Sequence, residues 1–134
     1  MLAAYPLSSL VVVISLFVYI WMSFKVGAAR AKYDVHAPVV DGAPEFLRVY
    51  RVHINTLEQL VIFFPALIMF AAGWGDLPAA IVGIFWPVGR VLYALGYFKS
   101  PDKRGPGFGI SFLSSMILLL GALVAVARIL TEQL

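Results

Sequence analysis

The chain has 134 residues, of which 62% are hydrophobic and only 13% are charged, and its mean hydropathy is +0.94. Ordinary soluble domains are about 45–50% apolar and about 25% charged. A soluble core of this length could not hide so much apolar surface from water. The composition therefore excludes an ordinary soluble domain and predicts an integral membrane protein.

Four apolar stretches are each long enough to cross a bilayer as a helix, which takes about 20 residues. They run over Tyr5–Phe24, Asn55–Gly73, Leu77–Phe98 and Phe108–Ile129. The runs lack the alternation that is typical of barrel strands. We therefore expect one all-α domain over residues 1–134, a bundle of four transmembrane helices at about 5–32, 45–73, 77–98 and 107–131. No basic residue precedes the first run and no cleavage pattern follows it, so we expect it to be a retained helix.

Glycine and proline mark the breaks between these helices. Residues 33–44 contain two Pro, a Gly and two Asp, which predicts a loop. The GWGD turn at 73–76 precedes Pro78, and Asp76 or Leu77 is expected to cap the next helix. Residues 99–109 form the third break. Two further prolines, Pro65 and Pro87, lie inside apolar runs, where we expect kinks rather than helix ends.

The basic residues indicate how the chain is oriented in the membrane. The first loop is flanked by Lys25, Arg30, Lys32, Arg48 and Arg51, and the third loop holds Lys99, Lys103 and Arg104, whereas the second has Asp76 and no basic residue. By the positive-inside rule, loops 33–44 and 99–107 are predicted to face the cytoplasm, with both termini on the opposite side. The net charge of +3 is mostly this topology signal. No solvated basic face is left for nucleic acid.

Two polar stripes interrupt the apolar helices. Arg51, Asn55 and Glu58 have the spacing i, i+4, i+7, and a second stripe contains Arg90, Tyr93 and Tyr97. A charge deep in hydrocarbon costs at least about 2.5–3.5 kcal/mol, so such residues normally face the bundle interior and have partners. Two facing stripes would form a pocket in the cytoplasmic half of the membrane.

A purely structural interpretation of these stripes stays open. Glu58 could pair with Arg51 or Arg90 as a packing device, and the tyrosines could anchor the interface. However, Arg30, Arg51 and Arg90 outnumber the one buried acid, which favours a ligand with carboxylates for arginine and an ammonium for Glu58. His53 is expected to donate or accept a hydrogen bond behind the site rather than to catalyse. The chain has no Cys and only two His, without metal-ligand spacing, so we expect no metal.

Two segments resemble a known family. Residues 42–55, GAPEFLRVYRVHIN, are similar to the signature of the membrane-associated proteins in eicosanoid and glutathione metabolism, or MAPEG. That family contains microsomal glutathione transferases, leukotriene C4 synthase and the 5-lipoxygenase-activating protein. Residues 90–98, RVLYALGYF, resemble its Arg-x-x-Tyr-x-x-Gly-Tyr segment, and Arg104 follows at the spacing seen in catalytic members. The likeness covers nearly the whole chain.

The resemblance implies a homotrimer with glutathione bound between subunits near the cytoplasmic face. Arg104 matches the arginine that stabilises the glutathione thiolate, although a loop cation like Lys103 is the alternative interpretation. The activated thiolate would attack a lipophilic electrophile or a lipid hydroperoxide that arrives through the membrane lipid. The candidate glutathione-binding residues are Arg30, Arg51, His53, Asn55, Glu58, Gln59, Arg90, Tyr93 and Tyr97.

Some residues depart from the family pattern. Leu47 replaces a signature Glu, His53 stands where Gln or Asn is usual, Thr56 where the eicosanoid branch has Cys, Gln59 where leukotriene synthase has a glutathione-contacting Tyr, and Ala31 where that enzyme has a second Arg. These differences disfavour specialised leukotriene synthesis. They leave a general glutathione transferase or glutathione-dependent peroxidase as the expected function.

Two alternatives remain at this point. A non-catalytic lipid-binding scaffold of the same family would bind a fatty acid but not glutathione. A small proton-driven multidrug exporter is also a four-helix protein, but such exporters carry an acidic residue in the first helix. Residues 5–24 contain no acidic residue, and Glu58 lies in the second predicted helix.

Overall fold

A computed structural model of the chain describes residues 2–133, which form helices joined by short connections. The elements in chain order are α1 (Pro6–Tyr33), α2 (Pro44–Trp74), α3 (Asp76–Gly83), α4 (Phe85–Lys99), the short 3-10 helix η1 (Pro101–Arg104) and α5 (Gly105–Gln133). Four helical segments are long and apolar enough to cross a membrane, with α3 and α4 counted together as Asp76–Lys99. The expectation of an all-α protein with four membrane-spanning helices is confirmed.

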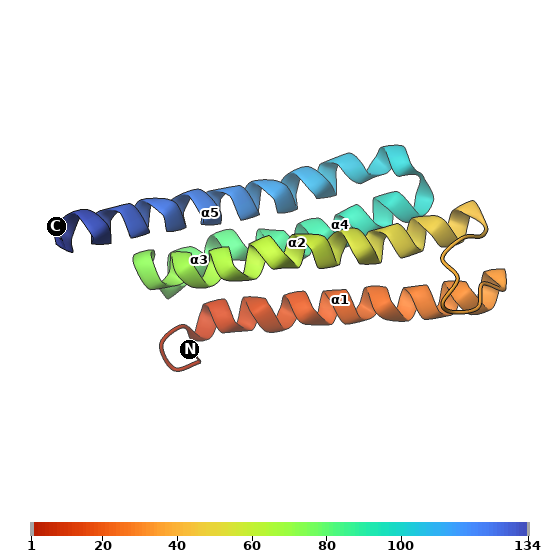
Figure 1. Cartoon of the computed structure of the whole chain (residues 1–134), viewed down its shortest axis with the longest axis horizontal. Coiled ribbons are helices and arrows are strands. Elements are labelled where there is room, and N and C mark those ends of the chain that lie inside the picture. The colour runs from red at the N-terminus through yellow and green to blue at the C-terminus, as the bar shows by residue number, and fades with distance from the viewer. Residues whose placement is uncertain (1, 134) are drawn as a thin grey trace.

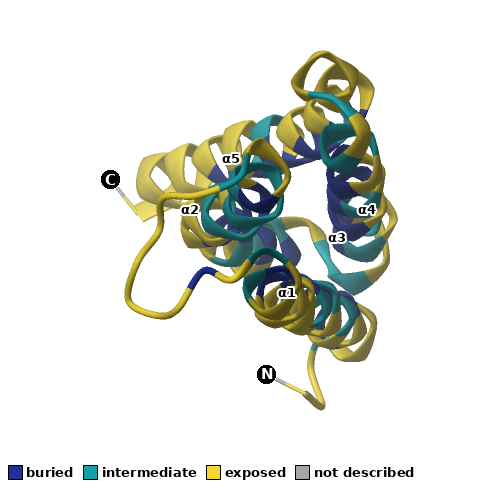
Figure 2. Cartoon of the chain, turned by 90° about the vertical axis from the view of Figure 1, so that its right-hand side faces the viewer, coloured by how far each residue is buried: buried dark blue, intermediate teal, exposed yellow. Residues whose placement is uncertain are grey.

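The long helices lie side by side along one axis (Figure 1). The connection between α1 and α2 and the turn at η1 lie at the same end, and the start of α1 and the end of α5 lie at the other. We call the first of these the η1 end. Seen along the axis, the helices turn their buried residues toward one another and their exposed residues outward (Figure 2). Helix α2 packs against α1, α4 and α5.

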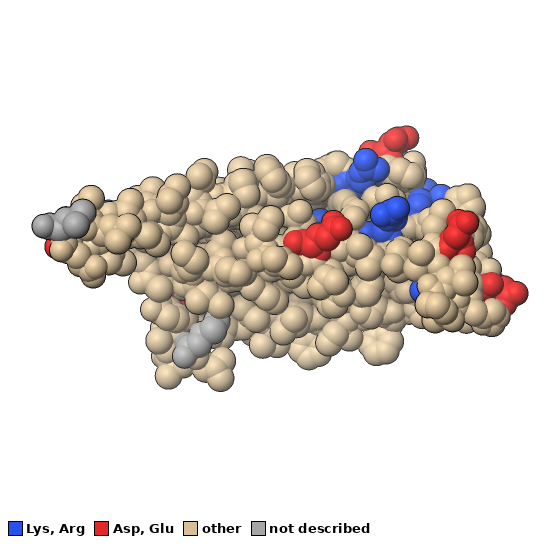
Figure 3. All heavy atoms as spheres, viewed as in Figure 1, with Lys and Arg blue, Asp and Glu red and all other residues tan. Residues whose placement is uncertain are grey.

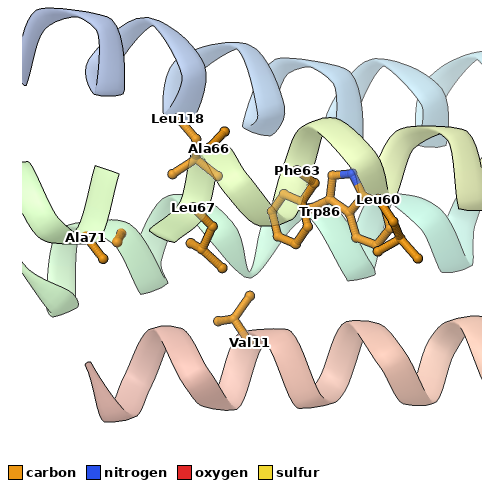
Figure 4. Close-up of a cluster of buried hydrophobic side chains, with 9 residues drawn as sticks. Val11, Leu60, Phe63, Ala66, Leu67, Ala71, Trp86 and Leu118 are labelled. Atoms are coloured by element: carbon orange, nitrogen blue, oxygen red, sulfur yellow. The ribbon is translucent and has the colours of Figure 1, made fainter. Parts of the chain in front are cut away.

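The interior is built from aromatic and branched side chains. Phe63 on α2 stacks on Trp86 of α4, with ring centres 4.5 Å apart and planes within 8°. Leu67, Val11 and Leu118 join the same cluster from three different helices (Figure 4). Large apolar side chains also cover the outside, where lipid tails would be as apolar as the side chains themselves. This surface is what a bilayer requires.

The prolines inside the apolar runs have different effects. Pro65 lies within α2, which continues past it without interruption. The third span is divided at Ile84, three residues before Pro87. Proline has no N–H to donate, so Pro87 cannot bond the Gly83 carbonyl one turn earlier. Ile84 keeps right-handed helical angles (φ −64°, ψ −25°), and the chain therefore continues from α3 into α4 as a single span.

Asp76 does not cap its own helix, contrary to the expectation from the turn sequence. Gly75 occupies the N-cap position of α3, and no side chain caps that helix. The Asp76 carboxylate instead accepts hydrogen bonds from the backbone N–H groups of Leu7 (2.8 Å) and Ser8 (2.7 Å) in the first turn of α1. A carboxylate at a helix N-terminus satisfies free donors and complements the helix dipole. Asp76 therefore ties α3 to the start of α1.

Candidate functional site

The candidate site is a cavity of about 540 Å³ near the η1 end. It lies between the half of α2 that follows its N-terminus, the C-terminal half of α4 and the first turn of α5. The residues that line it are Arg51, Asn55, Tyr93, Tyr97, Arg104 and Phe108. On the face shown in Figure 3, charged side chains of both signs gather toward this same end, and the rest of that face is mostly uncharged.

Helical spacing explains why α2 and α4 each give two residues to this cavity. Arg51 and Asn55 are four residues apart on α2, and Tyr93 and Tyr97 are four apart on α4, so each pair lies on one face. Asn55 Nδ2 donates a hydrogen bond to the Tyr93 hydroxyl at 2.8 Å, which joins the two faces. Because that hydroxyl oxygen accepts from Asn55, its proton is available to an acceptor in the cavity.

The ring of Tyr97 lies between Tyr93 and Arg104. Its centre is 5.6 Å from that of Tyr93, with the two rings edge to face at 70°. The guanidinium carbon of Arg104 lies 5.4 Å from the centre of the Tyr97 ring. One arginine nitrogen, Nη1, donates to the Pro101 carbonyl at 3.3 Å, while the side chain as a whole stays exposed. Arg104 thus reaches the cavity as a cation held at one point by η1.

Two glycines allow η1 and α5 to come close to α4. A Cβ atom on Gly96 would overlap the Lys103 carbonyl oxygen, so η1 packs directly on the last turns of α4. A Cβ on Gly107 would overlap the backbone N of Tyr93 and would lie 2.5 Å from its Cα. Neither position has room for a side chain. These contacts set the distance between Tyr93 on one wall and Arg104 with Phe108 on the other.

The cavity is positively charged. Among the residues that the structure describes, its lining includes two arginines and no carboxylate. Arg51 also lines an adjoining cavity of about 230 Å³ together with Arg48 and Tyr97. Arg48 donates through Nε to the Phe98 carbonyl at 3.2 Å. A cavity with unmatched guanidinium groups suits an anionic ligand, because arginine forms strong paired hydrogen bonds with carboxylates.

Arg90 lies behind the cavity rather than in its lining. Its side chain is 1% exposed, and both Nε and Nη2 donate to the Thr56 hydroxyl, at 3.1 Å and 2.7 Å. The guanidinium carbon is 3.9 Å from the centre of the Tyr93 ring. Arg90 therefore contacts Tyr93, a residue of the cavity wall, without itself lining the cavity.

The remaining sequence-predicted residues lie elsewhere in the single chain. Glu58 is exposed on α2 and Gln59 is half-buried, and neither belongs to the cavity lining. His53 faces α1, where Nε2 is 2.9 Å from the Ser23 hydroxyl and the ring stacks on Tyr19 at 4.6 Å. Arg30 holds the connection after α1 instead. The glutathione-binding roles of Arg30, His53, Glu58 and Gln59 stay predictions.

The contacts that the structure records for Arg30 are with the connection after α1 and with the start of α2. Its Nη1 donates to the carbonyls of Val35 (3.2 Å) and Val39 (2.6 Å), and its guanidinium lies 5.2 Å from the Phe46 ring centre. Phe46 is itself fully buried near the start of α2. Arg30 therefore fixes the path of the chain from α1 to α2 in this structure.

Sequence reasoning missed Phe108 and Thr56. Phe108 lies four residues after Arg104, which places both on one side of the turn from η1 into α5, and this spacing was the available signal. The sequence marked Thr56 only as a departure from the family pattern. Its hydroxyl is the acceptor for Arg90, a contact that no local spacing reveals because 34 residues separate the two.

Fold and cavity together define a small multi-pass membrane protein with a positively charged pocket at one end of its helix bundle. The chain belongs to the MAPEG family, whose model matches residues 8–124. An uncharacterized protein of Synechocystis sp. is 45% identical over 88% of this chain and 86% of its own length. Human microsomal glutathione S-transferase 2 is 39% identical, over 85% of this chain and 78% of its own length. Leukotriene C4 synthase of Bos taurus is 29% identical, over 85% of this chain and 77% of its own length.

Proposed function

We propose that this protein is a membrane-bound glutathione transferase, which activates the glutathione thiolate for attack on lipophilic electrophiles. Two kinds of observation support this function. Similar proteins over most of the chain are named as microsomal glutathione S-transferases and as leukotriene C4 synthase. The observation that carries the proposal is the cavity, which combines Arg51 and Arg104 with Asn55 and two phenols and has no carboxylate among its described lining residues.

Glutathione matches this cavity in charge and in chemistry. It has two carboxylates, one ammonium and a thiol, so at neutral pH it is an anion that two arginines can hold. The cavity volume of about 540 Å³ falls within the range of about 300–1,000 Å³ that is usual for small-molecule sites. The ligand also supplies the sulfur nucleophile, because this chain contains no cysteine.

In the proposed reaction, Arg104 acts on the sulfur of bound glutathione. A free thiol has a pKa of about 8.5, and a neighbouring cation lowers that pKa and so increases the thiolate fraction at neutral pH. Arg104 directly precedes α5, whose N-terminus adds a partial positive charge. The thiol proton leaves to water, the thiolate forms a carbon–sulfur bond with the electrophile, and the leaving group departs with its bonding electrons.

We further propose that the complete site forms between subunits of a homotrimer, at the cytoplasmic side of the membrane. Glu58 is a charged side chain exposed on the outer face of a membrane-spanning helix. A charge in that position normally has a protein or ligand partner. A neighbouring subunit would supply the partners of Glu58 and bring Arg30, His53 and Gln59 of one chain toward the cavity of another. Native mass spectrometry of the purified protein should then give a trimer mass.

The direct test is calorimetric titration of glutathione into detergent-purified protein, followed by a turnover assay with an aryl halide. We expect saturable binding and release of halide, with the conjugate identified by mass. A parallel assay with a lipid hydroperoxide measures whether two glutathione molecules are oxidised to the disulfide. Fatty-acid binding without a glutathione signal would replace the proposal with the scaffold function. A dimer that couples cation uptake to protons would replace it with the exporter function.

A further inference from the structure

Arg90 is a buried cation with a neutral partner. Its side chain is 1% exposed, and the hydroxyl of Thr56 accepts both of its recorded hydrogen bonds. Over residues 2–133 the structure records no acidic partner for this guanidinium. Removing an arginine from water is costly, and one hydroxyl compensates only part of that cost. An apolar residue would fill the same space without the penalty, so a packing role alone does not explain an arginine at this position.

The Arg90 guanidinium contacts the cavity wall at one residue, Tyr93. Its central carbon is 3.9 Å from the ring centre, a distance at which the cation interacts with the ring face. The other sides of Tyr93 are also fixed: Asn55 donates to its hydroxyl, Tyr97 meets it edge to face, and the backbone of Gly107 packs against its own backbone. The side chain is consequently held by three neighbours and its backbone by a fourth, and only the hydroxyl proton is free to turn.

The Arg90 cation against the Tyr93 ring makes an anion the preferred acceptor for the Tyr93 hydroxyl. Because Tyr93 Oη accepts from Asn55, its proton can be donated to a group in the cavity. A positive charge against the ring face favours donation to an anion over donation to a neutral acceptor. The proposed role of Arg104 places the glutathione sulfur on the η1 side of the cavity. The wall formed by α4 is then left for a carboxylate of the ligand.

We propose that Thr56 and Arg90 are positioning residues for glutathione binding, which hold the Tyr93 ring so that its hydroxyl donates to a carboxylate of the bound tripeptide. This inference rests on the proposed function. It differs from the sequence expectation for Arg90, because the arginine acts through Tyr93 and does not contact the ligand. It also assigns a role to Thr56, one of the residues at which this chain departs from the family pattern.

The test is to replace Thr56, whose hydroxyl accepts the hydrogen bonds of Arg90. Thr56→Val has nearly the same shape but cannot accept from Arg90, whereas Thr56→Ser keeps the hydroxyl. We expect Thr56→Val to raise the KM for glutathione about fivefold, the effect of losing one ordinary hydrogen bond, while kcat stays within about twofold. Thr56→Ser should behave as the unmodified protein does. Steady-state kinetics with glutathione varied at a saturating aryl halide separates the two constants.

A double-mutant cycle tests whether the effect passes through Tyr93. Tyr93→Phe keeps the ring that lies on Arg90 and removes the hydroxyl that is proposed to bind the ligand. If Arg90 and Thr56 act through this hydroxyl, adding Thr56→Val to Tyr93→Phe should raise the KM no further. Two independent increases that multiply would overturn the inference.

A merely structural role predicts a different pattern. It would lower the melting temperature of Thr56→Val and the yield of active protein but leave the KM of the surviving protein unchanged, and that result would overturn the inference. Should Thr56→Val not fold, Thr56→Cys takes its place, because a thiol of similar size is only a weak acceptor. If the unmodified protein gives no glutathione titration signal, the proposed function itself fails. If the unmodified protein binds glutathione and Thr56→Val and Thr56→Ser bind it equally well, only the inference about Thr56 and Arg90 fails.

Discussion

The two ends of this helix bundle differ in where their polar side chains find hydrogen-bond partners. At the end that holds the start of α1, the Asp76 carboxylate accepts two backbone hydrogen bonds, and Trp74 donates its ring N–H to the Gly121 carbonyl at 2.8 Å. At the η1 end, Arg51 and Arg104 face a cavity, and neither has an acidic partner among the described residues. At the first end Asp76 and Trp74 have their partners within the chain, whereas at the second Arg51 and Arg104 keep donors that can bind a ligand.

This difference indicates where binding energy is available. A polar group that is already bonded within the fold contributes to stability and gives little to a ligand. A guanidinium that faces a cavity without a carboxylate can form strong new bonds with an anion. Substitutions at the η1 end should therefore change glutathione binding and turnover, whereas substitutions at the opposite end should change stability alone.

The strongest expected effect comes from one methyl group that forces the two walls of the cavity apart. Gly107→Ala places a Cβ atom on the Tyr93 backbone, so α5 must move away from α4 and carry Phe108 with it. We expect glutathione binding to become undetectable by calorimetric titration. Gly109→Ala is the matched control, because its Cβ meets nothing within 4 Å and the change in helix propensity is the same. Equal binding by the two proteins would contradict the close approach of α5 to the cavity wall.

Removing the cation nearest to the proposed sulfur position should affect chemistry more than binding. We expect Arg104→Ala to lower kcat by about 100-fold or more, as is typical when a group that stabilises a reacting anion is removed. The Kd for glutathione should change only a few-fold. Lys103→Ala removes the neighbouring exposed cation and should leave kcat unchanged. Unchanged turnover in Arg104→Ala would mean that Arg104 is a loop cation like Lys103.

A smaller effect is expected from the other arginine of the cavity. Arg51→Gln should raise the Kd for glutathione about tenfold, since a hydrogen bond to a charged group is lost. Arg48→Gln removes the same charge one helical turn away, from a residue that lines only the adjoining cavity. It should change the Kd much less, which separates a direct contact from a general effect of net charge. Equal changes in both proteins would reduce the role of Arg51 to long-range attraction.

The four spans could be predicted from sequence because a bilayer imposes one simple requirement, a long apolar helix. Glycine and proline also marked where the connections lie, but not their bounds: the third break was predicted over residues 99–109, whereas α5 begins at Gly105 and contains the Gly and Pro of residues 105–109. The grouping of Arg51 with Asn55, and of Tyr93 with Tyr97, follows from four-residue spacing, and the structure brings the two pairs into one cavity. These features depend on local chain geometry, which the sequence contains.

The contacts that escaped prediction join residues far apart in the chain. Asp76 bonds to α1 across 68 and 69 residues, and Thr56 accepts from Arg90 across 34. Helical spacing states which residues share a face but not which helix that face meets. For the same reason it could not tell that Arg90 lies behind Tyr93, or that His53 turns toward α1. Such pairings are set by how the helices pack, and packing is not a local property.

The smallest expected effect on activity is at the opposite end of the bundle. Asp76→Asn keeps the shape of the side chain but replaces one of the two acceptor oxygens, which bind Leu7 and Ser8 separately, with an NH2 group that can only donate. One backbone donor in the first turn of α1 then loses its partner, so we expect a lower melting temperature in detergent. The KM for glutathione and kcat should stay unchanged, because the cavity lies at the other end. Asp102→Asn, an exposed residue of η1, should leave the melting temperature as it was. A rise in KM for Asp76→Asn would show that the two ends are coupled, and the division between a satisfied end and a binding end would then not hold.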